Sequence, residues 1–205
     1  MDTIAKLVEL FSRMPGIGPR QARRIVYFLL TQNHHTLEQL ANGLRNLKQY
    51  TEQCKDCHRY FAKEANAQEL CITCRDERRS DETCMIVEKD VDFENIERSG
   101  VFDGRYFILG GTISFFEKNP EAKARLDELK KVLEKRAGRG LKEVILAFSA
   151  TPAGEETTNY VKEIIEPIAK SSTIKVSLLG RGLSTGSELE YSDAETIKNA
   201  FTRRV

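Results

Sequence analysis

Cys54-Lys55-Asp56-Cys57 and Cys71-Ile72-Thr73-Cys74 are the two stretches that decide how this chain folds. Each is a Cys-x-x-Cys pair, and thirteen residues separate the two pairs. Such a pair lets two thiolates approach one ion from a tight turn. Two pairs complete a tetrahedral shell around zinc and leave no coordination position for a substrate. The sequence therefore predicts a structural zinc ion bound by Cys54, Cys57, Cys71 and Cys74.

The segment between the pairs, residues 58–70, is too short and too charged to bury a core, so the metal must supply its folding energy. Disulfides are the alternative, but nothing in the sequence indicates secretion, and a redox pair would not need a matched second pair. Asp56, Asp76 and His58 are expected to be surface residues rather than further ligands. Because a closed zinc site is not a catalyst, the function has to be sought on either side of it.

The composition is that of an ordinary globular protein, with 40% hydrophobic and 31% charged residues among 205. No apolar run is long enough to span a membrane, and the N-terminus does not open like a signal peptide. We therefore expect a cytoplasmic protein with reduced cysteines, in which Cys84 is a buried thiol.

The net charge of +1 hides an uneven distribution. No Asp or Glu occurs from Leu10 to Leu37, where four arginines lie, whereas residues 81–118 contain nine acids and four bases. This pattern suits a protein that meets phosphate at one site and proteins or metal at another.

The N-terminal block, residues 1–53, is predicted to be helical. Apolar residues from Ile4 to Phe11 follow helical spacing, and the stretch Met14-Pro15-Gly16-Ile17-Gly18-Pro19 then forms a break. Pro19 suits the first turn of a second helix, in which Arg20 and Arg24 lie opposite the apolar face and beside the glycine turn. Leucines from Leu37 to Leu47 indicate a third helix.

In the turn, backbone N–H groups, the positive end of the second helix and two arginines converge where one phosphate can sit. The stretch resembles a helix-hairpin-helix, a motif that grips a nucleic-acid backbone without reading bases. The candidate DNA-binding residues are Gly16, Gly18, Arg20, Arg23 and Arg24. The alternative is a plain helical hairpin with a solvated basic face; the absence of acids favours DNA.

After the cysteines, strands and helices alternate, which predicts an α/β domain with a mainly parallel sheet. Strands are expected at residues 84–87, 106–109, 144–148 and 174–179, and helices at 120–136 and 155–166. Pro167 is expected to break or kink the second of these helices. Ser192-Asp193-Ala194-Glu195 has the spacing of a capping box and is expected to start the last helix.

Functional groups in such a sheet gather at the carboxyl ends of the strands. Glu88 follows the first strand and Gly154-Glu155 follows the central one, which resembles the Toprim fold of topoisomerases, primases and some nucleases. The resemblance implies a glutamate, an Asp-x-Asp and a Gly-Glu that hold Mg²⁺, but Ser149 and Thr151 occupy both aspartate positions here. Neutral hydroxyls are poor Mg²⁺ ligands. We therefore expect a Toprim-like domain without the catalytic metal. Glu88 and Glu155 would then contact a partner, and the alternative for Glu88 is an exposed acid at the end of a strand.

The fold class expected from these parts is an all-α N-terminal block joined to an α/β domain. The expected divisions are a helix-hairpin-helix DNA-binding domain at 1–53, a four-cysteine zinc finger at 54–80, a Toprim-like domain at 81–180, and a C-terminal loop and helix at 181–205.

In this order the parts resemble the bacterial RecR family of recombination mediators over nearly the whole chain. Besides the order, the resemblance depends on Pro15-Gly16-Ile17-Gly18-Pro19, Cys71-Ile72-Thr73-Cys74-Arg75-Asp76, Ile86-Val87-Glu88, Ile108-Leu109-Gly110-Gly111-Thr112-Ile113-Ser114, Gly182-Leu183 and Leu189-Glu190-Tyr191. The chain departs from the family pattern at Phe115-Phe116-Glu117-Lys118 and at Ala153, which concerns the partner-binding surface more than the fold.

The resemblance implies a protein without enzymatic activity that forms ring-like tetramers around DNA. It also implies that RecO and RecF are partners with which the protein loads RecA at single-strand gaps during recombinational repair. Several hairpins around a ring would hold DNA more firmly than one. Two alternatives remain at this point: a Toprim-type Mg²⁺-dependent nuclease or primase-like enzyme that uses Glu88 and Glu155, and a zinc-stapled adaptor that binds only proteins.

Overall fold

The computed structural model describes residues 2–63, 69–113, 124–180, 190 and 194–202. The chain divides into two compact units, Met1–Thr51 and Glu52–Val205. In the described part of the chain, no helix is long and apolar enough to cross a membrane.

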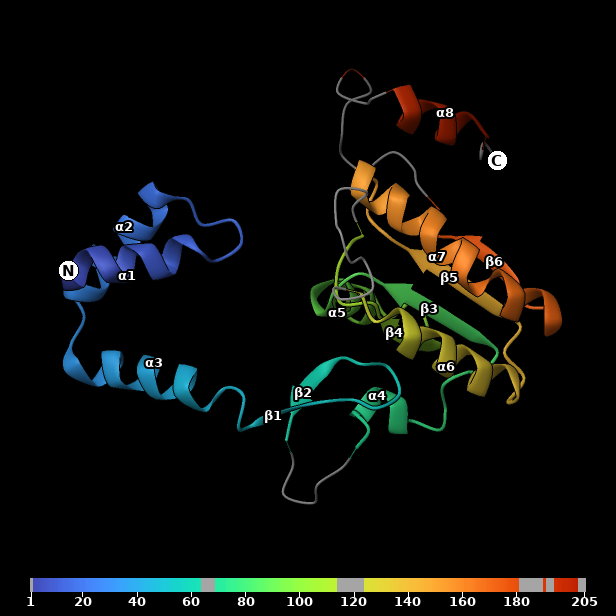
Figure 1. Cartoon of the computed structure of the whole chain (residues 1–205), viewed down its shortest axis with the longest axis horizontal. Helices are drawn as coiled ribbons and strands as arrows, with labels where there is room; N and C mark the ends of the chain where they lie inside the picture. The colour runs from blue at the N-terminus through green and yellow to red at the C-terminus, as the bar shows by residue number, and fades with distance from the viewer. Residues whose placement is uncertain (1, 64–68, 114–123, 181–189, 191–193, 203–205) are drawn as a thin grey trace. The chain divides into compact units, whose positions relative to one another are not determined.

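The N-terminal unit contains three helices, as predicted: α1 (Thr3–Ser12), α2 (Pro19–Leu30) and α3 (His34–Asn46) (Figure 1). The Asp2 side chain caps α1 by accepting a hydrogen bond from the Ile4 N–H, and Asn33 caps α3 by accepting one from the Thr36 N–H at 2.8 Å. α1 and α2 pack against each other, and the two fully buried residues of α2, Ala22 and Val26, lie on one face of the helix. The opposite face of α2 is therefore left to solvent.

The C-terminal unit is built on a four-stranded parallel sheet in the order β4-β3-β5-β6. Its strands are β3 (Thr83–Val87), β4 (Arg105–Ile108), β5 (Glu143–Ala147) and β6 (Lys175–Leu178). Val87 is aligned with Ile108 on one side and with Ala147 on the other. The residues that follow β3, β4 and β5 consequently meet at one edge of the sheet, as the parallel arrangement predicts.

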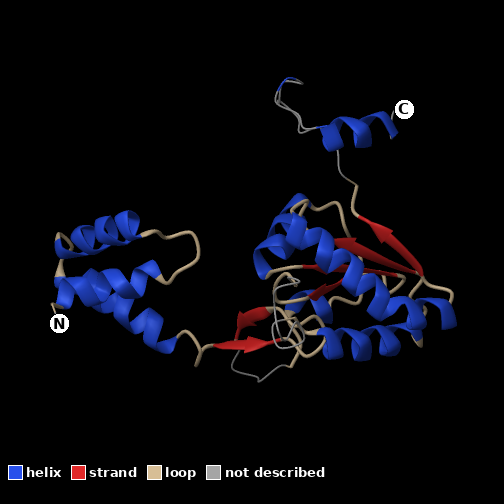
Figure 2. Ribbon diagram, turned by 45° about the horizontal axis from the view of Figure 1, so that its top comes forward, coloured by secondary structure: helices blue, strands red, loops and turns tan. Residues whose placement is uncertain are grey.

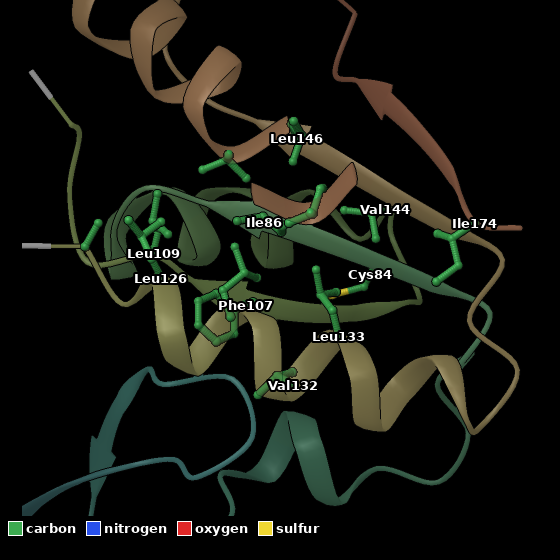
Figure 3. Close-up of a cluster of buried hydrophobic side chains, with 14 of the residues drawn as sticks. Cys84, Ile86, Phe107, Leu109, Leu126, Val132, Leu133, Val144, Leu146 and Ile174 are labelled. Carbon is green, nitrogen blue, oxygen red and sulfur yellow. The ribbon is translucent and has the colours of Figure 1, made fainter. Parts of the chain in front are cut away.

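The two faces of the sheet are covered by different parts of the chain (Figures 1 and 2). One face packs against α6 (Leu126–Ala137) and α7 (Pro152–Ser171), and Figure 3 shows its core. The other face packs against α5 (Asp90–Ser99) and the cysteine segment. Side chains of β3 alternate accordingly: Cys84 and Ile86 belong to the first cluster, Met85 and Val87 to the second. Cys84 is fully buried, as predicted.

The cysteine segment contributes a two-stranded sheet, β1 (Thr51–Gln53) and β2 (Tyr60–Ala62), and the single-turn helix α4 (Ile72–Arg75). The last described helix is α8 (Ala194–Thr202), and the predicted cap at Ser192 lies outside the described residues.

Two helix predictions need correction, and one further helix was not predicted. α6 begins at Leu126, so the predicted start at Pro120 is wrong for residues 124 and 125. The Arg125 N–H donates to the Leu109 carbonyl at 2.9 Å, which keeps this residue alongside the end of β4 instead of in the helix. Residues 120–123 lie outside the described part.

α7 begins earlier and ends later than predicted. Thr151 caps it by accepting a hydrogen bond from the Gly154 N–H, which allows the helix to start at Pro152, where proline is well tolerated. Pro167 does not end the helix, which continues to Ser171. The third difference is α5, which the sequence analysis did not predict because it carries only three large apolar residues among its ten.

Candidate nucleic-acid interface and metal site

The turn between α1 and α2 has the backbone of a tight hairpin. The Ile17 N–H donates to the Met14 carbonyl at 3.1 Å, and Gly16 has a φ of +75°, a left-handed conformation that glycine adopts without strain. Gly18 then stands at the N-cap of α2 with an extended backbone, and Pro19 occupies the first turn. The two candidate glycines therefore form the turn that leads the chain into α2.

The candidate arginines lie together on the exposed face of α2. Arg20, Arg23 and Arg24, with Pro19 and Tyr27, line a hollow of about 620 Å³. All three arginines are exposed, and in the described part of the chain none is paired with a carboxylate in the way that Arg13 is paired with Glu9. Three uncompensated guanidinium groups next to a helix N-terminus form a site suited to phosphate.

The four predicted metal ligands come together in the C-terminal unit. The sulfur atoms of Cys54, Cys57, Cys71 and Cys74 all lie within 4.8 Å of one another, and those of Cys57 and Cys71 are 3.6 Å apart. Tetrahedral zinc with Zn–S bonds of about 2.3 Å places its sulfurs about 3.8 Å apart, so the donor set fits this ion. Among the described residues, no other group of three or more His, Cys, Asp or Glu side chains is arranged to hold a metal.

Two interactions within the cluster favour the thiolate form of Cys54. The Cys71 N–H donates to the Cys54 sulfur at 3.4 Å. The hydrogen bond between the Cys54 and Cys57 side chains lowers the pKa of Cys54 and raises that of Cys57. A metal ion bound here would displace the thiol protons, because the thiolate is the form of cysteine that binds metal.

The cysteine cluster is joined to the outer edge of β4. The Ile108 N–H donates to the Cys57 carbonyl at 2.8 Å, and the Arg125 guanidinium donates to the Ile108 carbonyl at 3.0 Å and to the His58 carbonyl at 2.7 Å. The His58 ring packs on Phe107, with ring centroids 5.1 Å apart. The cysteine cluster therefore covers a sheet edge that would otherwise expose unpaired backbone groups.

Asp56 is not the surface residue that the sequence predicted. It accepts a hydrogen bond from Arg136 of α6 at 2.9 Å, and only 14% of its side chain is exposed. Arg136 is itself 4% exposed and also donates to the Tyr106 carbonyl at 3.1 Å and to the Cys84 sulfur at 2.9 Å. The reason for the error is that the partner lies 80 residues further along the chain, beyond the reach of local patterns.

The charges of this pair depend on each other. Burial alone would raise the pKa of Asp56, but Arg136 and then Lys135 lower it below its usual value. Burial opposes the charge of Arg136, but Cys84 and Asp56 raise its pKa above the usual value. Asp56 and Arg136 therefore form a buried ion pair that links the cysteine cluster to the core of the sheet.

The candidate acidic site at the strand ends holds one buried and one exposed glutamate. Glu88 is 6% exposed and accepts a hydrogen bond from the Ser149 N–H at 2.6 Å, so the alternative of an exposed acid is wrong. Glu155 is exposed in the first turn of α7.

The residues at the two aspartate positions have structural roles. The Ser149 and Thr151 hydroxyls are 2.9 Å apart, and Thr151 also caps α7. A side chain at Gly154 would come within 2.1 Å of the Ser149 carbonyl, so this close approach requires glycine. The loop is thus held by hydrogen bonds among uncharged groups and by the bond from the Ser149 N–H to Glu88.

The functional features that sequence analysis missed are the buried Arg136 and the aromatic ring of Tyr27 in the basic hollow. Arg136 follows Leu129 and Leu133 at helical spacing, so a charged residue on the apolar face of the predicted helix was an available signal. Tyr27 lies at i+7 from Arg20, which places it on the basic face, and that spacing was also readable.

A basic helical hairpin, a four-cysteine cluster and a parallel sheet with a glutamate at the strand ends define a protein of the helix-hairpin-helix and Toprim class. Three family models match the chain: "RecR, helix-hairpin-helix" at residues 4–48, "Toprim domain" at 82–180, and "RecR, C-terminal" at 182–205.

Relatives named Recombination protein RecR match nearly the whole chain. Those of Cereibacter sphaeroides and Magnetococcus marinus are each 35% identical, over 98% and 100% of this chain and 95% and 96% of their own lengths. That of Cutibacterium acnes is 34% identical over 98% of this chain and 94% of its own length. The chain belongs to the RecR family of recombination proteins.

Proposed function

We propose that the protein is a non-enzymatic recombination mediator that binds DNA as a ring-like clamp. In this role it works with RecO and RecF to promote RecA loading at single-strand gaps. The observation that carries the proposal is the face of α2 on which Arg20, Arg23 and Arg24 lie exposed without carboxylate partners among the described residues. Such a face binds the DNA backbone independently of sequence, since phosphate contacts carry no base information.

The cysteine cluster has a structural role in this proposal. Cys54, Cys57, Cys71 and Cys74 hold Zn²⁺, which supplies folding energy and leaves no position for substrate. The cysteines are free thiols in the structure, and a reducing cytoplasm would keep them available to the metal.

The strand-end site supports the non-enzymatic part of the proposal. Ser149 and Thr151 offer hydroxyls where Mg²⁺ chemistry needs carboxylates, and both are engaged in shaping the loop. Of the two glutamates, Glu155 is the one that a protein partner can reach. Glu88 is buried and positions the loop through the Ser149 N–H.

Replacing both Arg20 and Arg24 with Ala is expected to weaken DNA binding markedly at low salt. Each phosphate contact contributes about 0.9 to the slope of log affinity against log salt on duplex DNA. Two lost contacts should therefore lower this slope by about 1.8 for each protomer that touches DNA. Fluorescence anisotropy with labelled DNA at several salt concentrations measures both quantities.

The matched control removes two positive charges from elsewhere in the same unit, by Lys6→Ala and Arg45→Ala. Both side chains are exposed, and neither lines the basic hollow. If this control lost as much affinity and slope as the Arg20 and Arg24 variant, net charge rather than the face of α2 would explain DNA binding.

Self-association of the proposed ring is supported by an apolar groove in the N-terminal unit. The groove has a volume of about 280 Å³ and is lined by side chains of α1, α2 and α3, among them Leu7, Leu40 and Leu44. These three leucines are 37–58% exposed, which is a large apolar area to leave in water. In the proposed homotetramer, a second copy of the chain would cover this groove.

Leu44→Lys is expected to reduce the molar mass in light scattering toward that of a 23.3 kDa monomer. A charge in the groove would have to be desolvated at the interface between copies. Leu47→Lys is the control, because Leu47 is equally exposed, at 58%, but does not line the groove. A monomeric wild-type protein, or equal masses for the two variants, would refute the assignment of this groove to self-association.

A further inference from the structure

The basic hollow of the N-terminal unit contains an aromatic ring. Its lining comes from α2 alone: Pro19, Arg20, Arg23, Arg24 and Tyr27. The spacings of i+3, i+4 and i+7 from Arg20 place the three charged side chains and the tyrosine on one face of the helix. Tyr27 stands about 10 Å along the helix from Arg20, which is two helical turns. The hollow is thus a strip with guanidinium groups at one end and a phenol ring at the other.

Packing within the unit does not explain the position of Tyr27. The side of α2 that packs against α1 carries Ala22 and Val26, which are 0% and 1% exposed, and Tyr27 points away from that side, about 100° around the helix from Val26. The tyrosine is 55% exposed, although a ring of this size usually buries most of its apolar surface. A large part of its surface is therefore open to a ligand in the same hollow that the arginines line.

The chemistry of the hollow selects a ligand with two different parts. The guanidinium groups need an anion, and phosphate is the one for which their paired N–H groups are best suited. The phenol ring needs a flat apolar partner on which to stack. A nucleotide with an unpaired base provides both parts, whereas in an intact duplex the base faces are covered by neighbouring bases.

We propose that Tyr27 stacks on an unpaired base while Arg20, Arg23 and Arg24 hold the adjoining phosphates, so that the hairpin prefers single-stranded DNA to a fully paired duplex. This inference rests on the proposed DNA binding and specifies which form of DNA, single-stranded rather than duplex, the hairpin prefers. The arginines supply affinity for any DNA backbone, and the ring supplies the preference for unpaired bases.

The test compares Tyr27→Leu with Tyr27→Phe in the whole 205-residue chain, loaded with the proposed zinc. Stacking on an aromatic side chain contributes about 1–3 kcal/mol per base, so Tyr27→Leu should weaken binding to a labelled oligo-dT by about 5- to 150-fold. Affinity for a duplex of the same length should stay at the wild-type level. Tyr27→Phe keeps the ring and should keep the affinity for both. Neither variant should change the salt slope, because neither removes a phosphate contact.

A second measurement reports stacking directly. An oligo-dT with a single 2-aminopurine should lose fluorescence when bound by the wild type or Tyr27→Phe, but not when bound by Tyr27→Leu at saturating concentration. If Tyr27→Leu lost the same affinity for single-stranded and duplex DNA, or lost affinity for neither, the inference would be overturned. The proposed DNA clamp would still stand. Failure of the wild type to bind either DNA would overturn both. Thermal unfolding of each variant shows whether α2 and α1 still pack.

Discussion

Removing the proposed zinc ion with a strong chelator is expected to unfold the cysteine segment and to open the edge of β4. The segment contains a two-stranded sheet of three residues a strand and one turn of helix, which are too little structure to be stable alone. Zinc binding to small cysteine-rich folds has an apparent free energy of about 10–16 kcal/mol at neutral pH, so most of the local stability depends on it. The Cys57 carbonyl would then no longer accept a hydrogen bond from the Ile108 N–H.

Hydrogen exchange provides the sharpest measurement of this effect. The Ile108 amide belongs to a fully buried residue and should exchange slowly with zinc and rapidly without it. Elemental analysis should find one zinc per chain in the wild type and none in Cys71→Ser.

Cys84→Ser serves as the control, because Cys84 is buried outside the metal cluster and should leave the metal content unchanged. The contrary result is a metal-free protein that keeps slow exchange at Ile108 and an unchanged unfolding midpoint. That result would show that metal binding by the cysteines does not stabilise this unit as proposed.

Much of the fold was predictable because several signals are local. The apolar spacing from Ile4 to Phe11 predicted α1, and the run from Val144 to Phe148 predicted a buried parallel strand. The paired cysteines were informative for a different reason: their chemistry requires them to meet, so their spacing gives a long-range contact without any knowledge of the fold.

The errors arose where a distant partner decides the local structure. Arg125 stays outside α6 because its N–H donates to the Leu109 carbonyl at the end of β4, and no pattern near residue 125 shows this. α5 buries only Phe93 completely, which is too weak an apolar signal to predict a helix. Pro167 falls near the end of α7, and the helix continues past it to Ser171, after which the Ser172 N–H donates to the Ile168 carbonyl.

In the candidate sites, sequence located the residues but not their surroundings. Glu88 was predicted at a strand end, and its burial under Ser149 could not be foreseen, because the bond joins residues 61 positions apart. Arg20 and Arg24 were predicted on one face from spacing alone, because both belong to one helix. Sites within a single helix are therefore easier to predict than sites assembled from several strands.

Arg136→Met is expected to destabilise the C-terminal unit by about 3–5 kcal/mol, because it leaves Asp56 as a poorly solvated carboxylate without its main partner. The same change removes the donor to the Tyr106 carbonyl on the outer edge of β4. Urea unfolding of the zinc-loaded protein, followed by circular dichroism, measures the loss. The double variant Arg136→Met, Asp56→Asn should recover part of it, since an amide is less costly to bury than a charge.

The neighbouring residue provides a matched control for this prediction. Lys135 also pairs with Asp56, at 3.2 Å, but its side chain is 52% exposed, so Lys135→Met should cost about 1 kcal/mol or less. A large difference between the two variants would show that stability depends on the buried charge, and not on the number of ion pairs to Asp56. Equal effects would mean that Arg136 does not connect the metal site to the sheet.

Because Asp56 lies between the proposed ligands Cys54 and Cys57, Arg136→Met should also weaken zinc retention against a competing chelator, whereas Lys135→Met should not.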